Sequence, residues 1–429
     1  MNEALEKKIR FRTDVARLQS NAAAGVSSKL MVKESPEYDG RAGELFPIVL
    51  TNLFLTFITG GIYRFWAKTR VRRYFLSRVS FLGDRLEYTG TGKELFLGFL
   101  VVLAILVPLY IGFELLMNFA IGAGMTTVIA VQAGYVLFFY FLFNVAVYRA
   151  QRYRLSRTQW RGIRGGQTGS AMSYAVRAIG WSFITVMTLG LAYPMMRLQL
   201  QAYKTDHMSF GDENFTFDGE VGPLFKYWVP TWLCFAAFVI PIVLFYMEID
   251  YAGLMAGTAA APVFTDAHYT LAAVAAAGFV LFLIMQFWYR AAEIRHFADC
   301  TQFQQLRFET TLGGWQIFLP HLFYGAILLL LIFGASMLSV WMVKGMLTAG
   351  QSAEAMQAIG TIVTVGVVLI ALVIAGTLHP IIVQNMLFRV FCRAMTIHGT
   401  FSPDALLQNQ LNIPTRGEGL ADALDIDAF

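Results

Sequence analysis

Three stretches of the chain repeat one short pattern, in which an aromatic residue and a glycine precede Leu-Phe at the start of a long apolar run. The stretches are YDGRAGELF from Tyr38, YTGTGKELF from Tyr88 and FDGEVGPLF from Phe217. A longer match aligns residues 59–96 with residues 188–225 without a gap, and it pairs Gly61 with Gly190. Self-similarity over such a span is typical of a chain built from duplicated units. It constrains the architecture strongly and the chemistry hardly at all.

The composition places most of the chain in lipid. Hydrophobic residues make up 57% of it and charged residues 14%, with a mean hydropathy of +0.55, whereas soluble proteins have about 25% charged residues. Eight apolar runs approach the roughly 20 residues that a spanning helix needs. They cover residues 45–63, 96–117, 125–147, 178–194, 227–247, 267–288, 315–341 and 358–383.

The distribution of lysine and arginine predicts the orientation, because cationic loops remain on the cytoplasmic side. If the segments 63–96, 149–177, 193–226 and 290–314 and both tails are cytoplasmic, all of the 33 cationic residues except Lys344 lie inside. This scheme requires three helical hairpins, 96/147, 227/288 and 315/383, each of which crosses outward and returns.

The runs 45–63 and 178–194 then have both ends on the cytoplasmic side, so we expect them to be re-entrant or interfacial. Each ends in residues that can turn a helix, ITGGIY and MTLGLAYP, and a nearby hydroxyl can satisfy the freed backbone groups. The turn residues are Gly60, Gly61, Gly190 and Pro194. The alternative is a pair of short spanning helices in an inverted-topology repeat.

The loops after the first and fourth runs predict strands. Residues 79–90 and 208–219 alternate apolar and polar side chains around a Gly-Asp pair, which is typical of a β-hairpin. The expected fold is an all-α polytopic membrane protein with internally repeated helical hairpins, six spanning helices plus two re-entrant or short segments, and small cytoplasmic β-hairpins. The expected units are a cytoplasmic tail at 1–37, membrane repeats at 38–165 and 166–314, a degraded third repeat hairpin at 315–400, and a cytoplasmic tail at 401–429.

Several long motifs resemble one family. They are GRAGELFPIVLTNLFLTFITGGIYRFWAKTRVRRYF, SFLGDRLEYTGTGKELF, TLGLAYP and YRAQRYR. Over about residues 38–400 the chain resembles the YjgN-like family of bacterial inner-membrane proteins, a domain-of-unknown-function family. The resemblance implies a multi-pass protein of the bacterial inner membrane with both termini in the cytoplasm. It implies no established activity and no catalytic or binding residues.

Polar residues within the apolar runs are candidates for function because each is costly in lipid. Asn52 and Asn144 could hydrogen-bond between helices, and His379 could relay protons or occupy a helix kink. Tyr148-Arg149-Ala150 recurs as Tyr289-Arg290-Ala291 at the inner ends of two runs. Arg149 and Arg290 are therefore either interfacial anchors or pseudo-equivalent contacts to an anion or a lipid headgroup.

Signatures of enzymes and of metal sites are missing. The sequence lacks a zinc-peptidase H-E-x-x-H, a G-x-S-x-G elbow and a phosphate-binding loop, and Cys234, Cys300 and Cys392 stand far apart. We therefore expect no catalytic, cofactor-binding or metal-binding residues and no enzyme. The basic loops contain membrane-anchoring aromatic residues, which favours a bilayer with anionic headgroups as the partner and excludes nucleic acid.

Two classes of function remain. Internal repeats and broken apolar segments favour transport or translocation of a small solute or lipid. The alternative is a non-catalytic scaffold or partner subunit, which would bind another protein through the cytoplasmic β-hairpins. The family resemblance implies a membrane-associated metallopeptidase as that partner.

Overall fold

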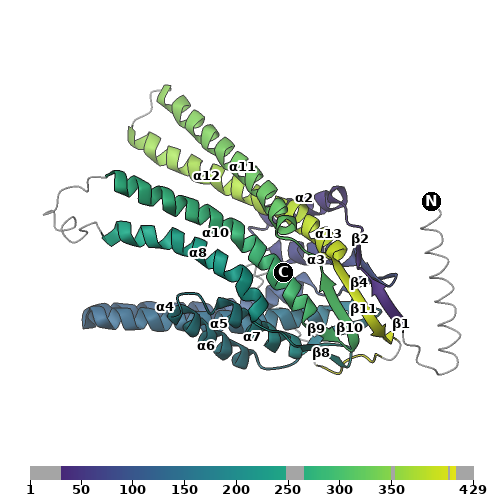
Figure 1. Cartoon of the computed structure of the whole chain (residues 1–429). Coiled ribbons are helices and arrows are strands. Elements are labelled where there is room, and N and C mark those ends of the chain that lie inside the picture. The colour runs from purple at the N-terminus through teal and green to yellow at the C-terminus, as the bar shows by residue number, and fades with distance from the viewer. Residues whose placement is uncertain (1–29, 248–264, 349–352, 404–405, 412–429) are drawn as a thin grey trace.

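Helical hairpins project from one side of a curved β-sheet (Figure 1). The computed structural model describes residues 30–247, 265–348, 353–403 and 406–411. The parts of the predicted tails at 1–29 and 412–429, and the predicted outer loop at 248–264, lie outside these residues. Along the described chain, helix pairs alternate with pairs of strands, so the chain leaves the sheet and returns to it after each helix pair.

The helices are α2 (Ala42–Ile58), α3 (Arg64–Ser77), α4 (Gly92–Ala123), α5 (Met125–Arg157), α6 (Ala171–Met187), α7 (Tyr193–Asp206), α8 (Gly222–Met247), α10 (Asp266–Asp299), α11 (Gly314–Thr348), α12 (Ala353–His379), the π-helical η1 (Pro380–Gln384) and α13 (Asn385–Ala394). The strands are β1 (Leu30–Glu34), β2 (Glu37–Tyr38), β3 (Val79–Phe81), β4 (Asp84–Tyr88), β5 (Thr158–Trp160), β6 (Ile163–Gln167), β7 (Met208–Phe210), β8 (Glu213–Phe217), β9 (Thr301–Phe303), β10 (Gln305–Thr310) and β11 (Met395–Phe401).

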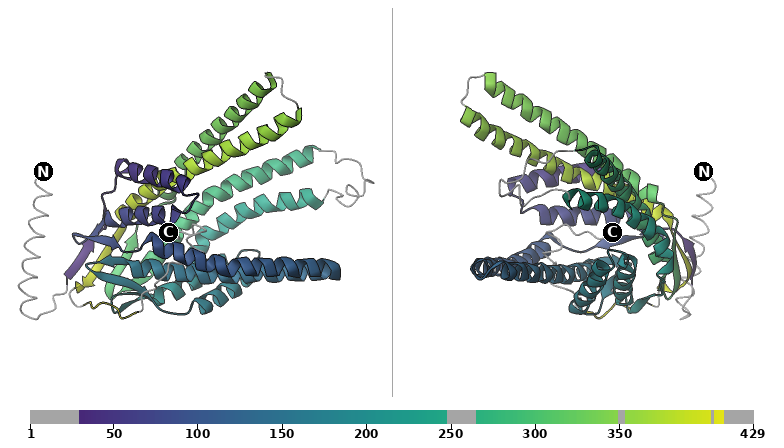
Figure 2. Two further views of the ribbon diagram at one scale, coloured as in Figure 1. Left: turned by 180° about the vertical axis from the view of Figure 1, so that it is seen from behind. Right: turned by 60° about the vertical axis from the view of Figure 1, so that its left-hand side comes forward.

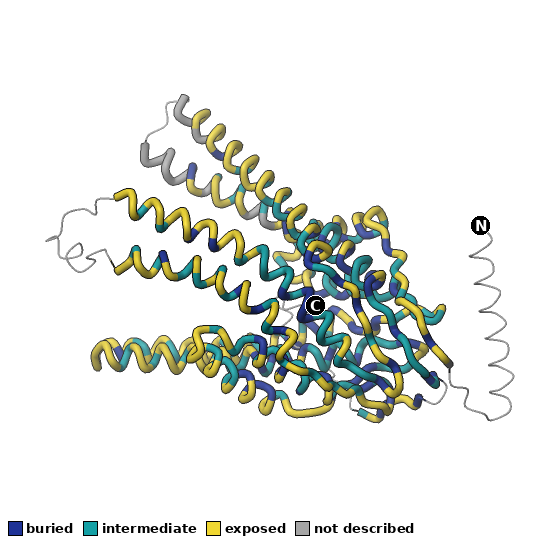
Figure 3. Tube along the Cα trace, in the orientation of Figure 1, coloured by how far each residue is buried: buried dark blue, intermediate teal, exposed yellow. Residues whose placement is uncertain are grey.

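Six helical stretches in the described chain are long and apolar enough to cross a membrane, and they form the three predicted hairpins. The hairpins are α4 with α5, α8 with α10, and α11 with the continuous stretch from α12 to α13. In the most apolar window of each stretch only 6–17% of the residues are buried, and the hairpins diverge away from the sheet (Figures 2 and 3). The fold is therefore a polytopic helical membrane protein whose helices leave most of their apolar surface for lipid.

The predicted re-entrant runs 45–63 and 178–194 cover most of α2 and the later part of α6, together with the turns that follow them. Each of these helices forms a shorter pair with the next one, α2 with α3 and α6 with α7. The first pair starts after β2 and ends before β3, and these two strands are hydrogen-bonded neighbours in the sheet. Strands β6 and β7 flank the second pair in the same way. Both ends of each pair therefore lie at the sheet, which is the chain path that a re-entrant segment requires. Their entry into a membrane stays a prediction.

The turns of the two short pairs have the same backbone conformation. Gly60 and Gly61 have φ of +58° and +91°, and the aligned Leu189 and Gly190 have φ of +51° and +91°. Positive φ favours glycine because a Cβ is crowded there. The glycines that the sequence singled out thus form the turns, and Leu189 occupies a left-handed position where the first turn has a glycine.

Replacing Leu189 with glycine is expected to stabilise the protein by about 0.5–1 kcal/mol, since relief of the left-handed strain exceeds the entropy that glycine adds to the unfolded chain. The Leu189 side chain is 78% exposed, so little packing is lost. The measurement is the thermal unfolding midpoint in detergent, and Gly60→Leu is the matched control that should lower it. Equal midpoints for both variants would contradict the assignment of strain.

A repeated tyrosine closes the base of each short helix pair. The Tyr74 hydroxyl accepts the N–H of Arg41 at 2.8 Å and donates to the Arg41 carbonyl at 2.9 Å. The Tyr203 hydroxyl makes the same two bonds to Ser170, both at 2.9 Å. Arg41 and Ser170 are the N-cap residues of α2 and α6. Tyr74 and Tyr203, which pair in the internal match of residues 59–96 with residues 188–225, therefore make the same contacts in both copies.

The repeated pattern of an aromatic residue followed by a glycine also has a structural cause. In each copy the aromatic ring lies over the glycine two residues later. A Cβ at Gly90 or Gly219 would lie 2.6 Å from the ring of Tyr88 or Phe217, and a Cβ at Gly40 would lie closer still to the side chain of Tyr38. These distances are shorter than any Cβ contact in a folded protein tolerates, so only glycine fits at this corner between a strand and a helix.

The sheet is a single half-barrel, which is larger than the small β-hairpins that the sequence predicts and includes both of them. Strands do form within residues 79–90 and 208–219, but they belong to one 11-stranded antiparallel sheet in the order β1-β11-β10-β9-β8-β7-β6-β5-β4-β3-β2. The remaining strands escaped prediction for two reasons. Strands β1, β2 and β11 pair with strands distant in sequence, and the local hairpins β5/β6 and β9/β10 each include a strand of only three residues, whose sequence signal is weak.

Aromatic contacts show how strongly the sheet curves. Trp160 on β5 and Phe401 on β11 are six strands apart in the order, which in a flat sheet means about 29 Å. Their ring centroids lie 6.1 Å apart, and Phe303 also lies 6.1 Å from Phe401. Val32 on β1 belongs to the same buried cluster. The concave face therefore encloses its own hydrophobic core, separate from the membrane helices.

The C-terminal segment 406–411 covers the turns at the far end of this half-barrel. Arg164 donates to the side-chain oxygen of Asn409 at 3.1 Å, and the N–H of Leu407 donates to the Asp212 carboxylate at 2.9 Å. Leu406 is buried in the aromatic core. These contacts tie the segment 406–411 to hairpins formed much earlier in the sequence.

Candidate functional site: a polar pocket beside a buried ion cluster

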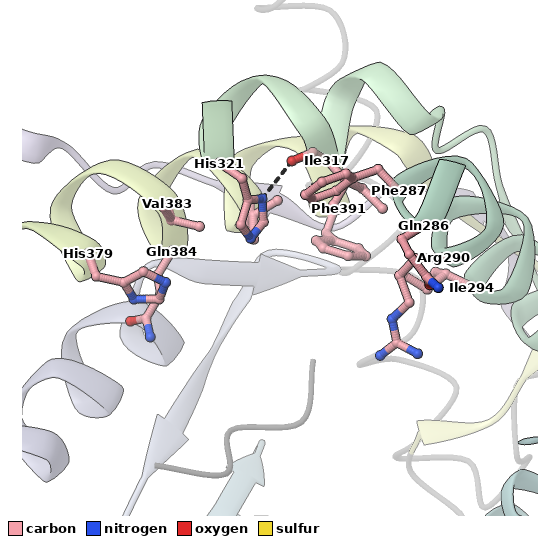
Figure 4. A pocket seen from close by; sticks show the side chains of 11 residues that line it. Gln286, Phe287, Arg290, Ile294, Ile317, His321, His379, Val383, Gln384 and Phe391 are labelled. Carbon is pink, nitrogen blue, oxygen red and sulfur yellow. Dashed lines mark hydrogen bonds between the residues drawn. The ribbon is translucent and has the colours of Figure 1, made fainter. Parts of the chain in front are cut away.

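A cavity of about 430 Å³ lies between α10, α11 and the stretch from α12 to α13. Its polar lining consists of Gln286, Arg290, His321, His379 and Gln384, and the rest is apolar, including Phe287 and Phe391. Figure 4 shows His379 and Gln384 at one side of the pocket and Gln286 and Arg290 at the other. The pocket therefore combines polar groups that converge from three helices with an apolar wall.

A local widening of the last helix shapes one wall. The π-helix η1 follows His379 directly and begins at Pro380, which has no N–H to donate. Such π-turns are frequent at functional sites because they redirect side chains within a helix. Residues at both ends of the widened turn, His379 and Gln384, line the pocket. The widened turn thus contributes to the pocket wall through its residues Val383 and Gln384.

His321 faces the pocket with one defined ring nitrogen. Its Nδ1 lies 2.7 Å from the carbonyl oxygen of Ile317 (Figure 4). A carbonyl only accepts, so Nδ1 carries the hydrogen of this bond. The Nε2 atom is then the nitrogen available for an acceptor role or for a second proton.

Arg290 connects the pocket to a buried carboxylate. Glu293 on α10 is 1% exposed and lies between two guanidinium groups. Arg197 on α7 holds it with Nε to Oε1 at 2.6 Å and Nη2 to Oε2 at 3.3 Å, and Arg290 contacts the Oε2 oxygen. The fork-to-fork arrangement fixes the carboxylate. This group of three is called the ion cluster below.

Lys204 on α7 lies beside the ion cluster. Its ammonium lies 5.4 Å from the centroid of the Tyr174 ring, and no hydrogen bond or ion pair to it occurs in the described chain. Burial of the ammonium, together with the nearby guanidinium groups of Arg197 and Arg154, lowers the pKa of Lys204 from 10.5 to about 8. Glu293 acts in the opposite direction. The surroundings of Lys204 are therefore net positive.

This lowered pKa predicts that stability rises with pH. Between about pH 8 and 10.5 the unfolded chain binds the Lys204 proton and the folded chain does not, so the folded state gains as pH increases through this window. Thermal unfolding midpoints of the wild type are expected to rise there relative to those of Lys204→Met. The variant should also have the higher midpoint at pH 7. A constant difference between the two proteins across the window would contradict the pKa assignment.

The structure brings some predicted residues together and leaves others apart. Arg290 and His379 line one pocket, whereas Arg149 is exposed on α5 and is not among its lining residues. Strands β5 and β9 begin at Thr158 and Thr301, so the two arginines differ by two residues in their distance from the next strand. Two residues rotate a side chain by about 200° around a helix. The pseudo-equivalence of the two arginines as ligand contacts stays a prediction.

The predicted asparagines have local partners. Asn52 is buried, donates to the Ala67 carbonyl of α3 at 3.3 Å and accepts from Arg70 at 3.1 Å. Asn144 is also buried and donates to the Tyr140 carbonyl of its own helix at 2.8 Å. Pro194 is buried at the first turn of α7. These residues lie outside the pocket lining.

The sequence reasoning missed Glu293, Arg197 and Lys204, because all three were part of segments expected to be solvated cationic loops. One signal was present. Arg290 and Glu293 are three residues apart directly after an apolar run, and that spacing places opposite charges side by side on a helix. In the described chain, no group of histidine, cysteine and acidic residues is arranged to hold a metal ion.

Comparison with known proteins yields one family and one relative. A sequence model of the family described as "Bacterial protein of unknown function (DUF898)" matches residues 34–324. Over 80 residues the chain is 36% identical to the inner membrane protein YjgN of Salmonella typhimurium, and the match covers 19% of this chain and 20% of that protein. The chain thus matches only about a fifth of that relative's length. No solved structure matches the chain.

Proposed function

The chain belongs to the DUF898 family of bacterial proteins, and from that premise we propose that it transports or translocates a small anionic solute or lipid across the inner membrane. The supporting observation is the pocket beside Arg290. It combines a guanidinium group, two imidazoles and two amides with an apolar wall, and its volume falls within the usual range for ligand sites. Intramembrane polar groups mark such sites because they are costly elsewhere in lipid.

The form of the surrounding helices also supports transport. Transporters bind their substrates where helices are interrupted, since the interruption exposes polar backbone and side chains inside the membrane. Here the interruption is η1, and it borders the pocket. The hairpins on either side expose most of their apolar surface. An amphiphile could therefore reach the pocket from the surrounding lipid. The wall of Phe287 and Phe391 could accept the first part of an acyl chain.

We also propose how the protein is oriented in the membrane and how its two short helix pairs are related. We infer that the half-barrel lies in the cytoplasm, because the cationic residues of the described chain gather near it while the outer helix ends hold only Lys344. We also infer that the two short helix pairs are duplicates that dip into the inner leaflet. Their shared turn geometry and tyrosine contacts support that relation. No enzymatic activity is proposed.

A reconstituted assay tests the function. The purified protein is placed in vesicles whose inner leaflet carries fluorescent phosphatidylglycerol, and arrival in the outer leaflet is followed by a membrane-impermeant quencher. We expect faster arrival than in protein-free vesicles, and at least a tenfold loss in His379→Ala. Lys344→Gln, which alters an exposed residue at the outer end of α11, is the control. Rates equal to those of protein-free vesicles, for lipid and for entrapped glycerol phosphate, would refute transport.

The scaffold alternative has one observation in its favour. The outward parts of the hairpins diverge, and their apolar faces are not covered by other helices of the described chain (Figure 2). Helices of a partner subunit, in place of lipid, could cover them. A stable complex recovered from mild detergent, together with inactivity of the isolated protein in the vesicle assay, would favour this alternative.

A further inference from the structure

His321 presents one ring nitrogen to the pocket. Its Nδ1 donates to the Ile317 carbonyl at 2.7 Å, and in the described chain no hydrogen bond to its Nε2 occurs. The ring of Phe287 packs beside the imidazole with the two centroids 5.2 Å apart, which restrains its orientation. Nδ1 carries a hydrogen in the neutral form of this tautomer and in the protonated form. A proton added to the ring therefore appears at Nε2.

The charged and titratable groups that face His321 come from two helices packed against α11. Arg290 lines the pocket from α10 and contacts Glu293 on the same helix. His379 lines the pocket from the end of α12. The lining residues from η1 and α13 do not titrate, and they are Val383, Gln384, Leu387 and Phe391. On α11 itself, Tyr324 lies one turn beyond His321, and a tyrosine ordinarily changes charge only near pH 10.

Two of the described lining residues, His321 and His379, can therefore change charge between about pH 5 and 8. Their positions differ. The ring of His379 lies edge-on to that of Tyr324, with the centroids 5.4 Å apart. In the view of Figure 4 the ring of His321 lies between His379 and Arg290. A ligand that extends from one polar side of the pocket to the other thus passes His321.

We propose that the pocket binds an oxyanion together with one proton, which His321 holds on Nε2. This inference rests on the proposed function and specifies how its anion is carried. The protonated ring donates from Nε2 to an oxygen of the ligand, while Nδ1 keeps its bond to the Ile317 carbonyl. The proton comes from the water on the side where the ligand enters, and it leaves the ring when the ligand leaves.

Two physical effects favour the joint binding of an oxyanion and a proton. Opposite charges attract strongly where water is excluded, so an oxyanion beside Nε2 favours the protonated ring. The protonated ring favours the oxyanion to the same extent, because coupling between two ligands is reciprocal. The proton also cancels one negative charge of the ligand, which lowers the cost of moving an anion through hydrocarbon. A phospholipid headgroup and a free phosphodiester share this chemistry.

Binding to the full-length protein at two pH values tests the inference and separates the two sources. The probes are phosphodiesters, which keep one negative charge throughout this range, so the pH dependence of binding comes from the protein. Glycerophosphoglycerol is titrated in detergent by calorimetry, and phosphatidylglycerol is offered in nanodiscs and its retention followed by native mass spectrometry. We expect the effective probe to bind about tenfold more tightly at about pH 5.5 than at about pH 8.

The probe that responds to pH identifies the source of the oxyanion. A response of glycerophosphoglycerol indicates a free ester, and a response of phosphatidylglycerol alone indicates a lipid headgroup. Either result supports the site. Binding of neither probe, or equal binding at both pH values, overturns it.

A variant pair assigns the proton to His321. His321→Gln keeps an N–H donor but takes up no proton, so the ratio of affinities at the two pH values is expected to fall below about twofold. His379→Gln is the matched control, and it should keep the ratio of the wild type. A ratio in His321→Gln equal to that of the wild type would overturn the inference.

Proton uptake provides a readout that needs no variant. Titration of the wild type with the effective probe, in two buffers that differ in heat of ionisation, should show up to about one proton taken up per ligand near pH 7. A histidine with a purely structural role takes up none. Binding without proton uptake at any pH between about 5 and 8 would overturn the inference.

The result is separable from the outcome of the transport assay. Binding that is linked to a proton on His321, without movement of lipid or solute in vesicles, would retain this site and refute transport. Movement of lipid at the same rate at both pH values, in the wild type and in His321→Gln, would retain transport and overturn this inference.

Discussion

Replacing Gly278 with leucine is expected to destabilise the protein by about 3 kcal/mol, the upper end of the range for overpacking a tight contact. A Cβ at this position would lie 2.7 Å from backbone atoms of Ala237 and Phe238 on α8. Backbone atoms cannot move aside as a flexible side chain can, so α8 and α10 must separate. The measurement is the thermal unfolding midpoint of the detergent-solubilised protein.

Gly134→Leu is the matched control for this prediction. Gly134 lies in α5, and no atom lies within 4 Å of the position of its Cβ. Leucine there should raise helix stability slightly, by less than about 1 kcal/mol. If the two leucine variants unfold at the same temperature, the close contact between α8 and α10 is absent.

Removing the charge of Glu293 is expected to cost about 3 kcal/mol, because the substitution removes a buried carboxylate that two guanidinium groups contact. The test variant is Glu293→Gln, which keeps the size of the side chain. Combining it with Arg197→Met should recover part of the loss, since one of the unbalanced charges is then removed.

An exposed ion pair provides the control for the charge effect. Arg85 and Asp39 form a contact of 2.6 Å with both side chains 50% exposed, and pairs of this kind contribute less than about 1 kcal/mol. Asp39→Asn should therefore change the unfolding midpoint little. A loss as large as that of Glu293→Gln would mean that burial does not determine the cost.

The membrane architecture was predictable because it depends on local and additive properties. Hydropathy gives the helices, and the cationic residues determine how they pair. The turns at Gly61 and Gly190 could be found because the backbone there requires glycine. The half-barrel could not be predicted in the same way, because β5 and β11 meet across its core through Trp160 and Phe401, which are far apart in sequence.

The candidate site was predictable only in part, and for a similar reason. His379 and Arg290 could be identified from the sequence because each is polar and lies within or beside an apolar run. Arg197 and Glu293 come from separate helices and acquire their role only by meeting in space. In sequence each looks like an ordinary charge of a loop, so their pairing required the tertiary structure.

The order of strands has a consequence for the assembly of the protein during synthesis. Strand β1 pairs only with β11, the last strand of the described chain, while β2, joined to it through Ser35 and Pro36, pairs with β3. Strand β1, the first of the described chain, must therefore remain unpaired until the last hairpin has been inserted into the bilayer. The half-barrel can therefore be completed only after every hairpin is in place. A chain truncated before Met395 would expose an unpaired strand edge to quality-control proteases.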